Sequence, residues 1–223
     1  MPETTGGLVG SPAGSAAQDT AQRLMRAAVE AFAERGFHAT TTRDIASRAG
    51  MSPAALYIHY RTKEELLYRI SLVGHERSVR ILTEAAEGPG GPVERLTAAV
   101  TSFVRWHAER HTTARVVQYE LSALAEEHLA EISALRRRTG EIMRGILAEG
   151  VAAGQFEIPH IRSTARAILS LCIDVSRWFD PSGPDGPDVL AARYAALVLR
   201  MAGAGGGAEA GGAPAGTVTG SSG

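Results

Sequence analysis

The sequence predicts an all-α protein, and three observations lead to that class. Apolar residues recur at helical spacing along most of the chain, glycine and proline breaks divide it into about nine segments, and no hairpin dipeptide lies between alternating apolar residues. The chain has 223 residues, of which 44% are hydrophobic, so it can bury a sizeable core. Its formal net charge of −1 means that a polyanionic partner would have to bind a local patch.

Composition divides the chain into four parts. Small and polar residues without a period fill 1–17 and 203–223, where we expect a disordered arm and a disordered tail. Between them we expect an N-terminal domain over 18–78 and a second domain over 79–202. No stretch approaches the roughly 18 apolar residues of a membrane span, no signal-peptide pattern opens the chain, and the single cysteine excludes an internal disulfide. We therefore expect a cytoplasmic protein with no membrane partner.

The first two helices have clear ends. The first runs from about 19 to 35, and Gly36 ends it because glycine adopts the left-handed conformation of a helix C-terminus. A short second helix follows, with Thr41 or Thr42 as its N-cap, and stops at Gly50.

The third and fourth helices carry equally clear start signals. Ser52 can cap the third helix with Pro53 at its first position, and this helix ends near Tyr60. Thr62 and Glu65 have the spacing of a capping box at the start of the fourth helix. Further helices are expected at about 93–110, 112–124, 126–153, 161–179 and 186–202.

The second and third helices form a helix-turn-helix motif, whose second helix can enter a DNA major groove about 12 Å wide. Leu56 and Tyr60 make the inward stripe of that helix. The small side chains of Ala54 and Ala55 let the backbone approach a base edge or a thymine methyl group. Tyr57 offers a ring and a hydroxyl for a phosphate or base contact.

Lys63 is the only lysine of the chain and stands in the first turn of the fourth helix. A cation there opposes the helix macrodipole. A docked DNA phosphate would make the lysine favourable at this position, because the ammonium and the free backbone N–H groups would share one anion. In the alternative interpretation, Glu64 and Glu65 offset the charge and Lys63 is merely solvated.

The segment TTRDIASRAGMSPAALYIHYRTKEELL resembles the DNA-binding domain of the TetR family of bacterial regulators, with the motif at 41–60 in a match over about 18–78. The resemblance implies an operator of double-stranded DNA, palindromic because a homodimer reads it. It also implies the following DNA contacts: Thr42, Arg43, His59 and Lys63 on phosphates, and Pro53, Ala54, Ala55 and Tyr57 at or near bases. Segment 18–78 carries nine basic and seven acidic residues, a net charge of +2, which an ordinary mixed surface could also have.

The same resemblance implies a helical ligand-binding and dimerisation domain beyond the motif. Aromatic, Met and aliphatic residues on its converging helices suit a mostly apolar pocket with a few polar groups. Each residue taken singly is more often plain core. The candidate pocket residues are Phe103, Trp106, His107, Val117, Glu120, Met143, Leu147, Leu169 and Cys172.

Three other features of this domain have residue types that can carry chemistry. His107 and His111 share a helix face, but HAERH is not the H-E-x-x-H zinc motif, so we expect neither a metal nor a cofactor and favour a structural or ligand-bonding His107. Cys172 lies in an apolar helix, where burial is a better interpretation than nucleophilic reactivity. The run Arg136–Arg138 is either a solvated face or a contact for the phosphates of an anionic ligand.

The last two helices, about 161–179 and 186–202, are apolar on more than one face. We expect them to be covered by the same pair from a second chain, giving a homodimer; a self-contained monomer core is the alternative. The segment SRWFDPSGPDGPDVLAARYAALVL is similar to the end of a TetR subgroup that responds to CoA thioesters. This similarity implies an acyl-CoA or another hydrophobic metabolite as the small-molecule effector.

We therefore predict a ligand-responsive, DNA-binding transcriptional regulator that acts as a repressor and is not an enzyme. One alternative is an enzyme acting on a small apolar substrate, but no nucleophile, acid/base pair or metal set has the required spacing. The other is an architectural DNA-binding protein that has no ligand and a filled core.

Overall fold

The computed structural model describes residues 12–204, with side chains from residue 17 onward. Within this range every regular element is a helix and there is no strand, which confirms the predicted all-α class. The elements are α1 (Pro12–Ala39), α2 (Thr42–Arg48), α3 (Pro53–His59), α4 (Lys63–Ala86), α5 (Pro92–Glu109), α6 (His111–Glu120), the 3-10 turn η1 (Leu121–Ala123), α7 (Glu126–Ala152), α8 (Ile161–Trp178) and α9 (Pro187–Met201).

Two boundaries differ from the expected ones. Helix α1 begins at Pro12, so residues 12–17 of the expected arm are helical, whereas 1–11 and 205–223 lie outside the described residues. The helix expected over 112–124 ends at Glu120 and continues as η1.

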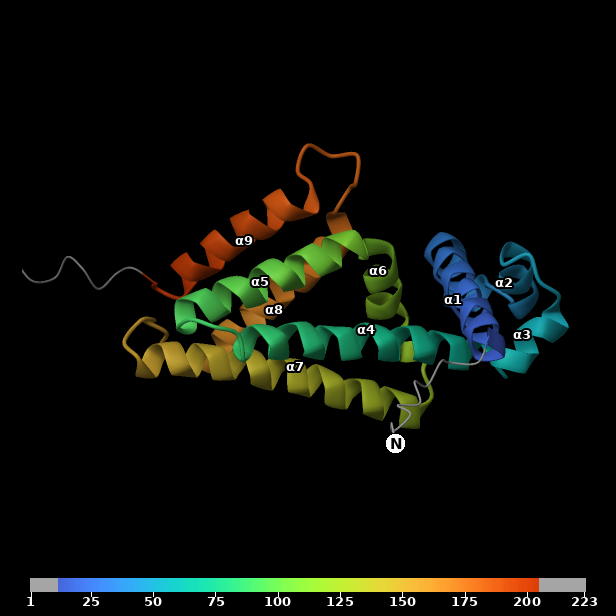
Figure 1. The fold of residues 1–223 in the computed structure, drawn as a ribbon, viewed down its shortest axis with the longest axis horizontal. Helices are drawn as coiled ribbons and strands as arrows, with labels where there is room; N and C mark the ends of the chain where they lie inside the picture. The colour runs from blue at the N-terminus through green and yellow to red at the C-terminus, as the bar shows by residue number, and fades with distance from the viewer. Residues whose placement is uncertain (1–11, 205–223) are drawn as a thin grey trace, which may run out of the picture.

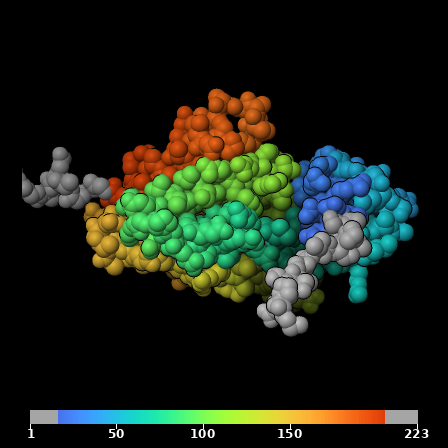
Figure 2. Space-filling model, viewed as in Figure 1, coloured from blue at the N-terminus to red at the C-terminus, as the bar shows by residue number. Residues whose placement is uncertain are grey.

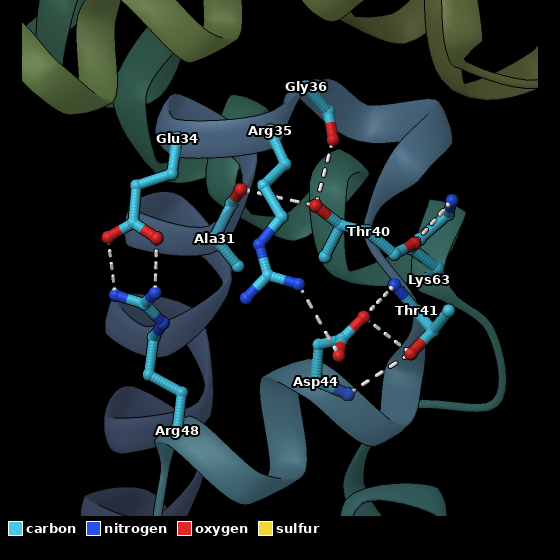
Figure 3. Close-up of polar contacts among 9 residues, drawn as sticks. All are labelled: Ala31, Glu34, Arg35, Gly36, Thr40, Thr41, Asp44, Arg48 and Lys63. Carbon is cyan, nitrogen blue, oxygen red and sulfur yellow. Dashed lines mark hydrogen bonds and ion pairs between the residues drawn. The ribbon is translucent and has the colours of Figure 1, made fainter.

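The break in α1 lies at Gly36, whose φ of 77° and ψ of 163° interrupt the helix as predicted. A left-handed φ of this kind suits glycine because any Cβ would be strained there. The turn is then fixed by Thr40, whose hydroxyl lies 2.8 Å from the Gly36 carbonyl oxygen and 3.1 Å from that of Ala31 (Figure 3). The chain thereby leaves α1 at a defined angle toward α2.

Two hydrophobic cores hold the fold. The first joins α1–α4 to α6 and α7, because Val116, Val117 and Ile132 pack with head residues such as Leu24 and Ile45. The second lies among α4, α5, α7, α8 and α9. In Figure 1 the head formed by α1–α3 stands at one end of the molecule, while α4, α5 and α7 run along its length. Figure 2 shows that the head makes a lobe distinct from the elongated body.

Candidate functional site

Local capping positions the two helices of the motif. Thr41 is the N-cap of α2: its Oγ1 accepts from the Asp44 N–H at 3.1 Å, and the Asp44 carboxylate accepts from the Thr41 N–H at 2.9 Å. Ser52 caps α3 by accepting from the Ala55 N–H at 3.2 Å. Gly50, with a φ of 67°, makes the turn between the two helices. These local signals were readable in the sequence because each cap involves residues three apart.

The inner side of α3 is anchored and its outer side is free. Leu56 and Tyr60 are buried, as predicted. Tyr57 is 52% exposed and its hydroxyl lies 3.0 Å from the Oγ1 of Thr42, which ties α3 to the start of α2. Ile58 is 82% exposed, the highest value among the exposed large apolar residues of the part described with side chains.

Ile58 was missed in the sequence, although its spacing from Ala54 and Tyr57 places the three on one outward stripe. The remaining expected contact residues on this side differ in exposure. Arg43, Pro53 and Ala54 are exposed, whereas Thr42, Ala55 and His59 are half-buried.

Ion pairs hold α2 against α1 (Figure 3). Arg48 binds the Glu34 carboxylate through both terminal nitrogens and reaches Glu30 at 3.3 Å. The hydrogen bond from Arg48 lowers the pKa of Glu34. Arg35 lies 3.6 Å from Asp44, so the capping carboxylate of α2 is itself held by α1. The orientation of the motif therefore depends on α1.

Lys63 has partners other than the phosphate expected from the sequence. Its Nζ donates to the carbonyl oxygens of Phe37 at 2.6 Å and Thr40 at 2.8 Å, with His38 O at 3.4 Å, and lies 4.2 Å from the Phe37 ring centroid. An ammonium has three hydrogens, and three carbonyls already face it. Burial lowers the pKa of Lys63, and the nearby Glu120 carboxylate opposes that shift. Lys63 thus fastens α4 to the turn that follows α1.

Two carboxylates connect the head to the rest of the molecule. Glu120, at the end of α6, accepts from the Phe37 N–H at 3.0 Å. Glu64, in the first turn of α4, accepts from the Ala125 N–H at 2.9 Å and lies 2.8 Å from Nδ1 of His128. The alternative interpretation assigned Glu64 to offset the charge of Lys63; in the structure its carboxylate bonds to the start of α7.

A cavity of about 490 Å³ lies among α4–α8. Its lining is more polar than expected and contains no aspartate or glutamate. The lining residues are His75, Ser78, Phe103, His107, Gln118, Ser133, Arg136, Arg137, Thr139, Gly140, Arg144, Arg162, Ala165, Arg166, Leu169, Ser170 and Ile173.

The cavity lining differs from the set of pocket residues expected from the sequence. Of the nine candidates only Phe103, His107 and Leu169 line the cavity. The other six lie elsewhere. Five of them pack between helices: Met143, Leu147 and Cys172 are core residues, Trp106 packs against that core, and Val117 belongs to the head core. The sixth, Glu120, accepts a hydrogen bond from the N–H of Phe37 in the head. Burial raises the pKa of the Cys172 thiol to about 12, so it is no nucleophile.

Five arginines give the cavity its charge: Arg136, Arg137, Arg144, Arg162 and Arg166. Within residues 17–204 none of them pairs with a carboxylate; Arg136 reaches the Gln118 oxygen at 3.3 Å. Arg138, the third member of the basic run, does not line the cavity and lies 3.6 Å from Glu141. The cavity is therefore strongly positive in a chain whose formal net charge is −1.

Two of the buried residues that line the cavity are histidines. His75 and His107 are 8% and 3% exposed. Burial lowers the pKa of both, that of His107 to about 4. Among the described residues no group of three or more His, Cys, Asp or Glu side chains is placed to hold a metal ion. The Nδ1 atoms of His107 and His111 each face a main-chain carbonyl.

Comparison with known proteins identifies the family. A model of bacterial regulatory proteins of the tetR family matches residues 24–70, and a model of the tetracyclin repressor-like C-terminal domain matches 89–202. The chain belongs to the TetR family. The first of these matches contains the whole helix-turn-helix motif, and the second contains most of the cavity lining.

Individual TetR proteins agree with this assignment. The HTH-type transcriptional repressor KstR2 of Mycolicibacterium smegmatis is 32% identical over 186 residues, covering 79% of this chain and 87% of that protein. A tetR-family regulatory protein from Rhodococcus RHA1 has a crystal structure with 46% identity and a TM-score of 0.78, covering 83% of this chain and 97% of its own. AibR, solved with isovaleryl coenzyme A and operator DNA, is 20% identical with a TM-score of 0.73 over 83% of this chain and 99% of its own, and shares the fold.

The protein is therefore a ligand-responsive, DNA-binding transcriptional regulator of the repressor type, as predicted. TetR regulators bind operator DNA and small-molecule effectors, typically as dimers. In the part of the chain that the structure describes, no helix has the length and apolar character needed to cross a membrane.

Proposed function

We propose that this TetR protein is a homodimeric repressor released from its operator by an anionic, amphipathic effector of the acyl-CoA type. The observation that carries the proposal is the set of five cavity arginines without carboxylate partners among the described side chains. We propose a binding role for this cavity, not a catalytic one. Because its partner is operator DNA, we place the protein in the cytoplasm.

The cavity supports an effector with two chemically different parts. Unpaired guanidinium groups favour phosphate oxygens, which they can bind in a bidentate manner. Phe103, Leu169 and Ile173 supply apolar lining beside the arginines. Coenzyme A thioesters combine phosphates with an acyl chain, and AibR, which shares the fold, binds one of them. We propose that the dimer has two conformations, which differ in the spacing of the DNA-binding heads. The effector releases the operator because it binds more tightly to the conformation that does not fit the DNA.

Removing two cavity arginines should abolish most of the effector affinity. For Arg137→Gln combined with Arg144→Gln we expect about a tenfold loss of affinity for a medium-chain acyl-CoA per substitution, because each removes a charged hydrogen bond. Isothermal titration calorimetry measures the loss, and fluorescence anisotropy of labelled upstream DNA measures operator release. Arg138→Gln is the matched control, since Arg138 lies in the same run but outside the cavity. Equal losses in both variants would contradict the proposal.

We propose that the exposed side of the motif reads the operator. The contact residues would be Thr42, Arg43, Pro53, Ala54, Ala55, Tyr57, Ile58 and His59. Ile58 joins the set because an exposed aliphatic group can contact a thymine methyl in the major groove. Lys63 leaves the set because its ammonium is occupied by carbonyls.

The dimer would form through α8 and α9. Trp178, Val189, Leu197 and Met201 are exposed large apolar residues, and all four lie on these two helices. Burying this face against a second copy would produce a two-fold pair of heads, and hence a palindromic operator. Half-sites would be about 34–36 Å apart or somewhat wider.

Ile58→Ser tests the recognition surface. We expect operator affinity to fall by about tenfold, because one apolar base contact is lost, while the exposed site leaves folding unchanged. Val73→Ser is the control, since Val73 is 54% exposed on α4 outside the motif. Anisotropy with upstream DNA gives both affinities, and light scattering of the complex should give two or a multiple of two chains per operator. An unchanged operator affinity of Ile58→Ser would contradict the proposed recognition surface. A single chain per operator would contradict the proposed dimer.

A further inference from the structure

We infer that the buried polar side chains lining the cavity offer a ligand hydrogen-bond acceptors only, and that they select an effector whose apolar part carries a hydroxyl group. These side chains are His75, Ser78, His107 and Thr139, the lining residues that are both polar and buried, and we call them the acceptor end. The inference rests on the proposed effector function and specifies the chemistry of the ligand.

The two imidazole rings are held in one tautomer. Nδ1 of His75 lies 2.8 Å from the Ser71 carbonyl oxygen, and Nδ1 of His107 lies 2.8 Å from the Phe103 carbonyl oxygen. A carbonyl oxygen only accepts, so each Nδ1 must carry the hydrogen. Burial lowers the pKa of both rings, and nearby Arg136 adds to the lowering for His75, so both are neutral at neutral pH. Each Nε2 is then an unprotonated acceptor.

Both Nε2 atoms are available to a ligand. Within residues 17–204 neither makes a hydrogen bond to the protein, whereas the rings line the cavity. The fully enclosed side-chain polar atom without a partner in this range is Oγ of Ser71. The Nε2 atoms are therefore not enclosed by protein, and the cavity is the space they reach.

The two hydroxyl groups of the acceptor end behave in the same way. Ser78 donates to the Gly74 carbonyl at 3.1 Å, and Thr139 donates to the Leu135 carbonyl at 3.0 Å. Both residues are 6% exposed. A hydroxyl has one hydrogen, so each of these oxygens has only lone pairs left for the cavity. Four polar side chains from three helices thus present acceptors without a donor.

A ligand group that contacts these four side chains has to donate. A ketone or thioester oxygen would face lone pairs there and lose its hydrogen bonds to water, which is costly in a buried site. A hydroxyl can donate to one Nε2 without bringing charge. An ammonium could also donate, but the cationic Arg136 close to His75 disfavours it. These points together favour a hydroxylated chain over an oxo or amino one.

The test compares matched ligands by isothermal titration calorimetry with the full-length protein. The probes are a medium-chain acyl-CoA and versions of the same length with one hydroxyl or one oxo group on the same carbon, the carbon being varied along the chain. At the best position we expect the hydroxyl compound to bind about tenfold more tightly than its oxo counterpart. The inference is overturned if the oxo compound binds as tightly at every position.

Variants assign the preference to the rings. In His75→Phe and His107→Phe we expect the hydroxyl preference to shrink to about threefold or less, as each removes one acceptor. His111→Gln is the control, because Nδ1 of His111 also faces a carbonyl, that of Ala108 at 2.9 Å, but the residue lies outside the cavity lining. A preference that persists in both phenylalanine variants would refute the assignment.

One measurement needs no variant and remains decisive if a substituted chain does not fold. Nitrogen-15 NMR of the wild-type histidines at neutral pH should show Nε2 of His75 and His107 unprotonated, with both resonances shifting when the hydroxyl compound binds. A protonated Nε2 in either ring overturns the inference. If CoA compounds bind without a hydroxyl preference, this inference fails and the proposed function stands. If none binds while the operator is still bound, the proposed effector fails and the inference with it.

Discussion

Replacing Gly150 with alanine should lower the free energy of unfolding by about 3 kcal/mol. Gly150 lies near the end of α7, and a Cβ there would come within 1.9 Å of Cδ2 of the Phe156 ring. The ring is only 5% exposed, and the N–H groups of Gln155 and Phe156 both donate to the Gly150 carbonyl at 2.9 and 3.1 Å. Because the ring is held on this turn, the new methyl group must expel it from the core.

Gly145→Ala on the same helix is the matched control. A Cβ at Gly145 would meet no atom within 4 Å, so alanine should raise stability by roughly 0.5–1 kcal/mol through its better helix propensity. Urea unfolding followed by circular dichroism measures both changes. Similar stability for the two variants would show that the packing of Phe156 on Gly150 is not as described.

Lys63→Met should destabilise the protein by about 2 kcal/mol even without DNA, because it leaves the carbonyls of Phe37 and Thr40 without their charged donor. Operator affinity should fall as well, since the turn that orients α2 is released. Chemical denaturation of the DNA-free protein measures the first effect. If Lys63 served only to bind phosphate, Lys63→Met would leave the stability of the DNA-free protein unchanged.

Arg80→Met is the control, because it removes a positive charge from α4 without removing the hydrogen bonds that Lys63 makes. Arg80 is exposed on the same helix, and we expect its replacement to change stability by less than about 0.5 kcal/mol. Equal effects of the two substitutions would contradict the structural role of Lys63.

The head was largely predictable because its signals are local. Gly36 ends the first helical segment, Ser52 and Pro53 start α3, and Leu56 and Tyr60 face inward, as the spacing indicated. The partners of Lys63 were not predictable in this way: the sequence suggested a DNA phosphate, whereas the structure shows main-chain carbonyls. The position of Lys63 in the first turn of α4 could be read, but its carbonyl acceptors come from a turn some 25 residues earlier, which only the tertiary fold brings close.

The cavity was much less predictable. Aromatic and aliphatic residues such as Met143 and Leu147 suggest a pocket, yet helices bury such residues against one another. The charged lining comes from α7 and α8, and neither helix alone shows that its arginines meet those of the other. The run Arg136–Arg138 was the sequence feature that best indicated a charged cavity, because contact with an anionic ligand was one interpretation of it. Two of its three residues line the cavity.

Cys172 has a practical consequence for spectroscopy. It is the only cysteine of the chain, it is fully buried, and at neutral pH a thiol with a pKa of about 12 is almost entirely unreactive toward maleimides and methanethiosulfonates. A thiol introduced at an exposed position of α2, such as Ser47→Cys, would then take up a spin label selectively in an otherwise native background. In the dimer that we propose, pulsed electron paramagnetic resonance between two such labels would measure the separation of the two heads in solution.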